Sequence, residues 1–152
     1  MISRKDRAIV KRIGDMFGIG ARLPEYDEKL NRAFILIHGS LFEHRISVYC
    51  EDNVLSLGAC ITKSPRNASV EFFKHILSMN VLIDAGSFCY SDANDSIYYS
   101  LSAPLMDNNS NEYIMYLLDI ASKVLDDFVP DILASTNASH GVNKRFNKRT
   151  FH

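Results

Sequence analysis

Three short apolar runs follow one another between residues 33 and 61, and this grouping constrains the fold more than any other feature of the sequence. Residues 33–38 are nearly all apolar, whereas residues 44–50 and 55–61 alternate between apolar and polar side chains. The polar stretch 51–53 between the last two runs is typical of a tight turn. Because no helix-length segment separates the runs, the pattern predicts an antiparallel meander of three strands.

A helix is predicted before this block and another near the end of the chain. Residues 3–17 place Ile9, Ile13, Met16 and Phe17 on one stripe, with Ser3 as N-cap and Gly18 as terminator. Residues 111–133 carry a longer apolar stripe at helical spacing. Pro130 lies near its end, so the last turn is expected to bend or the helix to stop earlier.

The segment from Asn67 or Ser69 to Asn80 is predicted to form a helix that is apolar on two sides. One stripe holds Val70, Phe73 and Leu77, and a second holds Phe72, Ile76 and Met79. Such a helix must be covered on both sides, by the sheet on one and by a second layer or second subunit on the other. We therefore predict that a homodimer contact forms at Phe72, Phe73, Ile76, Leu77 and Met79. The alternative is that these residues belong to the core of a single chain.

A further hairpin follows, with arms at residues 88–90 and 96–105 and a turn at 91–95. The full order is α-βββ-α-ββ-α, in which strands are grouped instead of alternating strictly with helices. This order predicts an α+β two-layer sandwich, with one antiparallel sheet and helices packed on it. We expect a single domain over residues 1–134. Residues 135–152, rich in Ser, Asn, Lys and Arg, are expected to form a basic, disordered tail.

Charge is spread unevenly along the 152 residues, although the net charge is only −1. Residues 1–12 hold five Lys or Arg and one acid, and residues 135–152 hold four and no acid. The span 13–134 is left with 8 basic and 17 acidic side chains. An acidic body with basic ends favours a basic or amphipathic protein partner over nucleic acid.

Composition also bears on location. No apolar run approaches the roughly 20 residues of a membrane helix, and no hydrophobic signal core follows the first residues. Three scattered cysteines, Cys50, Cys60 and Cys89, fit a reducing compartment better than a disulfide framework. We therefore expect a cytoplasmic protein with no membrane partner.

No motif in the sequence indicates catalysis, a metal or a cofactor. Gly18-Ile19-Gly20 follows a helix and lacks the rest of a dinucleotide fingerprint. The candidate metal ligands are His38, His44, Cys50 and Cys60, and they do not fall at usual ligand spacing. Cys50 is also in phase with the apolar face of its strand. We expect no catalytic residues, no metal and no cofactor.

Other chemistry-bearing residues have a plainer interpretation. Cys89 and His75 are a candidate thiol–imidazole pair, but nothing local supports that pairing. The Asp126-Asp127 pair is interpreted as a solvated helix face, and the acids between Asp92 and Asp95 as a turn.

The arrangement from 33 to 133 resembles the YbjN family and, through it, the class I chaperones of type III secretion. Phe34-Ile35-Leu36 and Ile46-Ser47-Val48 are similar to the opening strands of the family, and 76–80 to the end of its second helix. The stretches 86–92 and 96–105 resemble its glycine–aromatic strand and its closing Pro-Leu strand. The last helix, with Asp126, Asp127, Phe128 and Pro130, resembles the terminal helix of the family. The order of elements carries the likeness more than any single motif does.

The resemblance implies a non-enzymatic, usually dimeric protein. Chaperones of this fold bind an unfolded segment of a secreted effector over sheet and helix surfaces, and YbjN-like proteins are described as regulatory. We predict that a partner groove uses the apolar positions Ile9, Ile13, Phe34 and Leu36, with the monomer core as the alternative for these residues. Two other hypotheses stay open: a regulator that contacts nucleic acid through the basic ends, and an enzyme with an unrecognised thiol or carboxylate site.

Overall fold

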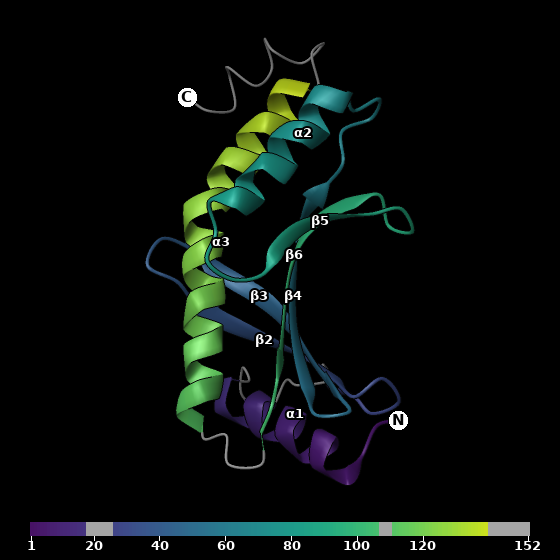
Figure 1. Ribbon diagram of the computed structural model, residues 1–152, viewed down its shortest axis with the longest axis vertical. Helices are drawn as coiled ribbons and strands as arrows, with labels where there is room; N and C mark the ends of the chain where they lie inside the picture. Colours follow the sequence, from purple (N-terminus) through teal and green to yellow (C-terminus); the bar gives the residue numbers. More distant parts are fainter. Residues whose placement is uncertain (18–25, 107–110, 140–152) are drawn as a thin grey trace.

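The computed structural model describes residues 1–17, 26–106 and 111–139. One antiparallel sheet holds all the strands in the order β1-β2-β3-β4-β6-β5, and it confirms the α+β class (Figure 1). The short β1 was not predicted. The elements are α1 (Arg4–Phe17), β1 (Tyr26–Asp27), β2 (Arg32–His38), β3 (Glu43–Glu51), β4 (Val54–Lys63), α2 (Val70–Ser78), the short 3-10 helix η1 (Met79–Val81), β5 (Ser87–Ser91), β6 (Ser96–Pro104) and α3 (Asn111–Ser139).

The predicted meander is confirmed, and its turn chemistry explains the register. Asp52 and Asn53 both have positive φ, at 51° and 62°, as the two central residues of a tight hairpin turn require. That turn pairs Val48 with Leu57, so the apolar residues of both strands fall on one face. The alternation ends at Ile61, where a bulge shifts the register between Cys60 and Thr62.

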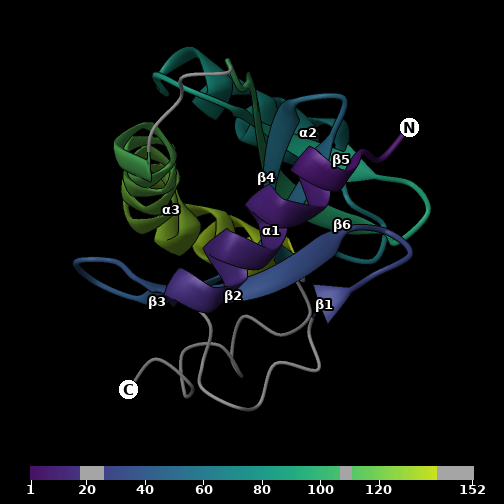
Figure 2. The same cartoon turned by 90° about the horizontal axis from the view of Figure 1, so that it is seen from below.

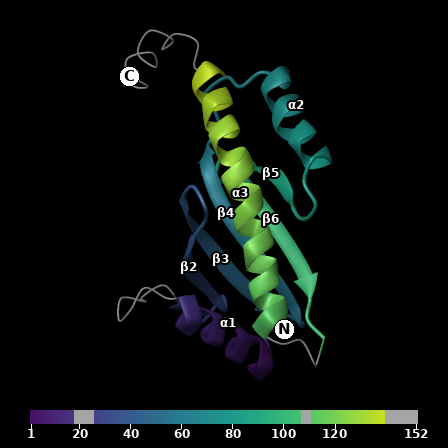
Figure 3. The ribbon, with the colours of Figure 1, turned by 90° about the vertical axis from the view of Figure 1, so that its left-hand side faces the viewer.

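The three helices cover one face of the sheet. α3 runs across that face, α1 packs at one end against β2 and β3, and α2 packs against α3 and β5 (Figures 1 and 3). The view from below shows α1 lying across β2 (Figure 2). The core between the layers holds Ile13 of α1, Ile46 and Leu57 of the sheet, and Leu118 of α3, all almost completely buried. The opposite face of the sheet carries no helix among the described residues.

The two apolar stripes of α2 have different surroundings. Phe72, Ile76 and Met79 are buried in the core, with at most 4% of each residue exposed. Val70 and Leu77 point away from it, with 66% and 57% exposed. Ser69 caps the helix, since its hydroxyl accepts a hydrogen bond from the Phe72 N–H at 3.1 Å. The fold therefore covers one side of this helix and leaves the other side open.

The last helix is longer than predicted. It continues through Pro130 to Ser139, so the expectation that residues 135–139 belong to a disordered tail was wrong. Beyond the proline, Ile132 and Thr136 are buried, and the Thr136 hydroxyl donates to the Ile132 carbonyl at 2.9 Å. Packing of this last part outweighs the lost proline hydrogen bond. Residues 140–152, and the predicted terminator Gly18, lie outside the described residues.

No helix within residues 1–17, 26–106 and 111–139 combines the length and the apolar character that crossing a membrane requires.

Candidate functional site

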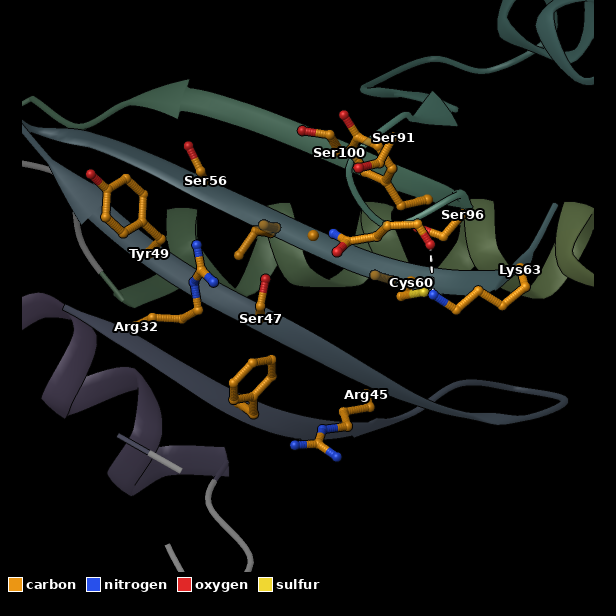
Figure 4. Close-up of a pocket in the computed structure, with 16 residues that line it drawn as sticks. Arg32, Arg45, Ser47, Tyr49, Ser56, Cys60, Lys63, Ser91, Ser96 and Ser100 are labelled. Carbon is orange, nitrogen blue, oxygen red and sulfur yellow. Dashed lines mark hydrogen bonds between the residues drawn. The ribbon is translucent and has the colours of Figure 1, made fainter. Parts of the chain in front are cut away.

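A hollow of about 690 Å³ lies on the face of the sheet that the helices leave open. Figure 4 shows α3 behind the strands and the labelled side chains of the hollow in front of them. Most of the lining comes from alternate residues of β2, β3, β4 and β6, which point away from the core. We call this surface the open face. Its position follows from the same period-two pattern that builds the core on the other side.

The floor of the hollow is a row of small residues that crosses the strands. Ser47 of β3 pairs with Gly58 of β4, and Gly58 pairs with Ser100 of β6. A side chain at Gly58 would approach the Ser47 hydroxyl to 3.1 Å. A glycine inside a strand often marks a place where another chain approaches closely. The row spans two inter-strand spacings, about 10 Å, which matches about three residues of extended chain.

Aromatic rings and long cations stand beside this floor. Arg32 pairs with Tyr49 across β2 and β3, and the two lie at one end of the hollow (Figure 4). The Arg45 guanidinium lies over the Phe34 ring, 4.7 Å from its centre. Such walls offer flat apolar surface next to positive charge.

Positive charge dominates the lining. Lys63 donates to the Asn94 carbonyl at 2.6 Å at the other end of the hollow. The Nε atom of Arg32 is buried, and no residue that the structure describes accepts a hydrogen bond from it. An acid in contact with the lining is Glu51, whose carboxylate accepts a hydrogen bond from the Tyr49 hydroxyl. That hydrogen bond raises the pKa of Tyr49 to about 12. Glu51 is also paired with the amino group of Met1 at 3.1 Å, which offsets its charge.

A second exposed surface is the outer stripe of α2, which we define as Val70, Phe73 and Leu77. Phe73 is half-buried, and its ring packs edge-on against Tyr90 of β5 at 5.2 Å between centres. Val81 and Leu82 follow directly and are 86% and 72% exposed. This amount of exposed apolar surface in neighbouring positions is typical of an interface.

Two buried carboxylates hold loops against the helices. The Asp6 carboxylate accepts from the backbone N–H of Ser3 at 2.9 Å and of Asn53 at 3.0 Å, and from the Cys50 thiol at 3.4 Å. Burial opposes its ionisation, but the hydrogen bonds from Ser3, Asn53 and Cys50 outweigh that effect and lower the pKa of Asp6 to about 2. Asp6 thus joins the start of α1 to the β3–β4 turn.

Asp126 has the same role at the β2–β3 turn, so its interpretation as a solvated acid was wrong. It is 6% exposed, and it accepts from the Ser40 N–H at 2.6 Å. Its Oδ1 lies 2.6 Å from Nε2 of His44. Burial raises its pKa, but the hydrogen bonds from His44, Ser40 and Leu41 have the larger combined effect, so the pKa stays below its ordinary value. Only Asp127, its neighbour, is exposed.

The predicted partner-binding positions divide between two places. Ile9 and Ile13 are buried under α1, at 8% and 0% exposed, which matches the core alternative for these two. Phe34 and Leu36 project from the other side of β2 and are half-buried, and Phe34 lines the hollow. Of the predicted dimer residues, Leu77 and part of Phe73 reach the surface, whereas Phe72, Ile76 and Met79 lie beneath them.

The candidate chemical residues have separate neighbours. His75 of α2 faces Asp131 of α3 at 3.7 Å, whereas Cys89 hydrogen-bonds to Ser87 within β5. His38 pairs with Glu43 at 3.1 Å, and Cys50 is buried beside Asp6. Across the part of the chain that the structure describes, no group of three or more His, Cys, Asp or Glu is placed to hold a metal ion.

Sequence reasoning missed the cations of the open face. Arg32, Arg45 and Lys63 were counted in the net charge but were not placed on one surface. The signal was present for Arg45, which falls in the polar phase of an alternating strand. For Arg32 and Lys63 it was absent, because both lie at strand ends beyond the predicted runs.

Comparison with known proteins gives a likeness of fold. No protein-family model matches the chain, and no curated protein matches it. The solved structures that match include a chain from the heterodimeric ExoU–SpcU complex of the type III secretion system of Pseudomonas aeruginosa. That match has a TM-score of 0.51 and 13% identity, and it covers 80% of this chain and 95% of that one. A chain of the HopA1–SchA chaperone–effector complex matches with a TM-score of 0.46 and 10% identity, covering 80% of this chain and 88% of that one. The chain therefore has a fold like that of a chain in the ExoU–SpcU complex, whereas the likeness to YbjN stays a prediction.

Proposed function

We propose that this protein is a non-enzymatic, cytoplasmic binding module that holds an extended segment of a partner protein on its open face. The observation that carries the proposal is the hollow of about 690 Å³ on a sheet face without helices, opposite a core that all three helices complete. The fold shared with a chain of the ExoU–SpcU complex of a type III secretion system supports the same function. The partner is then a protein that needs to be held unfolded, such as a secreted effector.

An extended segment suits this surface better than a folded domain. The floor is narrow and crosses the strands, with rings and cations on both sides. One edge of the sheet also offers backbone groups to such a segment, because β1 pairs only with Ala33 and Arg32 of β2. Within the described residues, the rest of β2 has no strand on its outer side, and sheet edges of this kind recruit extended peptides.

We further propose that two copies associate through the outer stripe of α2. Leu77 and Val70 are exposed on it, and the buried residues Phe72, Ile76 and Met79 support the helix from below. The exposed residues Val81 and Leu82 extend the same apolar surface. A homodimer would cover this surface on both chains at once, as a two-fold interface does.

Site-specific photo-cross-linking tests the main proposal. A photoreactive residue is placed at Ser56 or Ser100 on the open face and, as a matched control, at Asp119 or Lys123 on the exposed side of α3. The full-length protein is irradiated in its native cell, and the cross-linked partner is digested and mapped. We expect one contiguous stretch of one partner, obtained from the open face only. Cross-links that come equally from both faces would contradict the proposal.

A further inference from the structure

We infer that the open face selects a segment carrying carboxylate side chains, so that the partner segment is acidic. The inference rests on the proposed function and adds the chemistry of the ligand to it.

The distribution of charge carries the first step. Of the eight Lys and Arg between residues 13 and 134, three line the hollow: Arg32, Arg45 and Lys63. Of the 17 Asp and Glu in the same span, none of those that the structure describes lines it. The body of the protein is acidic, yet the hollow on its open face concentrates cations. Such a local field attracts negative charge to this face and repels it elsewhere.

The positions of the cations give the second step. Arg32 and Lys63 lie toward opposite ends of the hollow, with the small floor between them (Figure 4). The Nε atom of Arg32 is buried and has no hydrogen-bond partner among the described residues. A planar guanidinium binds a carboxylate through two parallel hydrogen bonds. Arg32 lines this end of the hollow, so a carboxylate bound there would lie next to its guanidinium group.

The rest of the lining favours a peptide over a nucleic acid. The floor is made of serine hydroxyls and a glycine, which suit the backbone of an extended peptide at close approach. Nucleic-acid binding depends on many phosphate contacts along a basic surface. The acidic surroundings of this small cationic hollow would repel a longer polyphosphate chain.

Three labelled peptides with one extended, alternating backbone test the inference, with Glu, Gln or Lys at every second position. Their affinities for the full-length protein are measured by fluorescence anisotropy at low and moderate salt. We expect the Glu peptide to bind at least about tenfold more tightly than the Gln peptide, with a preference that falls as salt rises. The Lys peptide should bind most weakly.

Charge reversal provides the matched comparison. The double variant Arg32→Glu with Lys63→Glu should lose the preference for the Glu peptide and bind the Lys peptide better than the wild type does. A misfolded variant would not gain affinity for the Lys peptide, so this result distinguishes charge reversal from loss of the fold. The control, Lys11→Glu with Lys123→Glu, changes the net charge equally on exposed helix positions and should keep the wild-type order.

The outcomes separate this inference from the proposed function. Equal affinity for all three peptides, or no binding of the Glu peptide, overturns the inference. The inference is also overturned if a single-stranded oligonucleotide binds more tightly than the Glu peptide and the double variant Arg32→Glu with Lys63→Glu loses that binding. Cross-links that still come only from the open face would leave the proposed function standing in each of these cases.

Discussion

His44 of β3 and Asp126 of α3 lie 82 positions apart in the chain, and their buried side chains meet at 2.6 Å. Asp126 also accepts hydrogen bonds from the Ser40 and Leu41 backbone in the β2–β3 turn. One carboxylate therefore fixes the tip of a hairpin to the helix that covers the sheet.

Removal of this carboxylate should destabilise the protein strongly. In Asp126→Ala the Ser40 N–H and the His44 ring lose their buried acceptor, so we expect a loss of about 3 kcal/mol in the free energy of unfolding. Urea unfolding followed by circular dichroism measures it. Asp127→Ala, at the exposed neighbour, is the control and should change the free energy by less than about 0.5 kcal/mol. Equal effects of the two substitutions would show that the buried contact is unimportant.

The same contact can be tested from the turn. A Cβ at Gly39 would overlap the Asp126 carboxylate, so Gly39→Ala should cost about 2 kcal/mol of folding free energy. In the background of Asp126→Ala the obstacle is gone, and Gly39→Ala should then cost much less. A double-mutant cycle by urea unfolding gives the coupling. Strict additivity of the two substitutions would count against the close approach.

Asp6 should make stability depend on pH in the acid range. Its pKa is lowered from 3.8 to about 2 in the folded state, so the folded protein holds fewer protons than the unfolded chain between these values. The contribution, about 2 kcal/mol, is complete above pH 4 and is lost as the pH falls toward 2. Asp6→Asn should be less stable at pH 7 and lose less on acidification. Asp15→Asn, exposed on the same helix, should follow the wild-type curve; an Asp6→Asn curve parallel to wild type would refute this role.

A substitution in the outer stripe of α2 should change the oligomeric state without unfolding the protein. Leu77→Glu places a charge at a 57% exposed position, so the melting temperature should stay close to wild type while the dimer dissociates. Sedimentation equilibrium measures the mass. Met115→Glu on α3, 42% exposed, is the control that should leave the dimer intact. A wild-type protein that stays monomeric at high micromolar concentration would rule out the dimer.

Much of the fold could be predicted because its signals are local. The alternation around Ile46 and Val48 gives both the strand and the face, and the Asp52-Asn53 turn gives the register. The double stripe of α2 predicted the buried side of that helix, whereas the cover of its exposed side by a second subunit stays a prediction. What the sequence did not reveal depends on contacts between distant residues. Asp126 looks like any polar helix residue until His44 and Ser40 are brought beside it.

The candidate site was harder to predict than the fold. Ile9, Ile13 and Phe34 are all apolar, and the sequence does not tell which of them face the core and which face the open side. The cations of the hollow come from three strands, and only the pairing of those strands places Arg32, Arg45 and Lys63 on one surface.

A thiol of the protein itself gives the most direct test of the open face. Cys60 lines the hollow and is exposed, whereas Cys50 is buried, and burial together with Asp6 raises its pKa to about 12. In the full-length Cys89→Ser variant, which retains Cys50 and Cys60, a small maleimide should therefore label Cys60 and not Cys50.

The rate of that labelling is measured with and without a saturating amount of the partner segment that cross-linking identifies. We expect the bound segment to slow labelling of Cys60 about tenfold or more, because it occupies the hollow. An unchanged labelling rate at saturation would contradict the account, since the segment would then bind somewhere other than the open face.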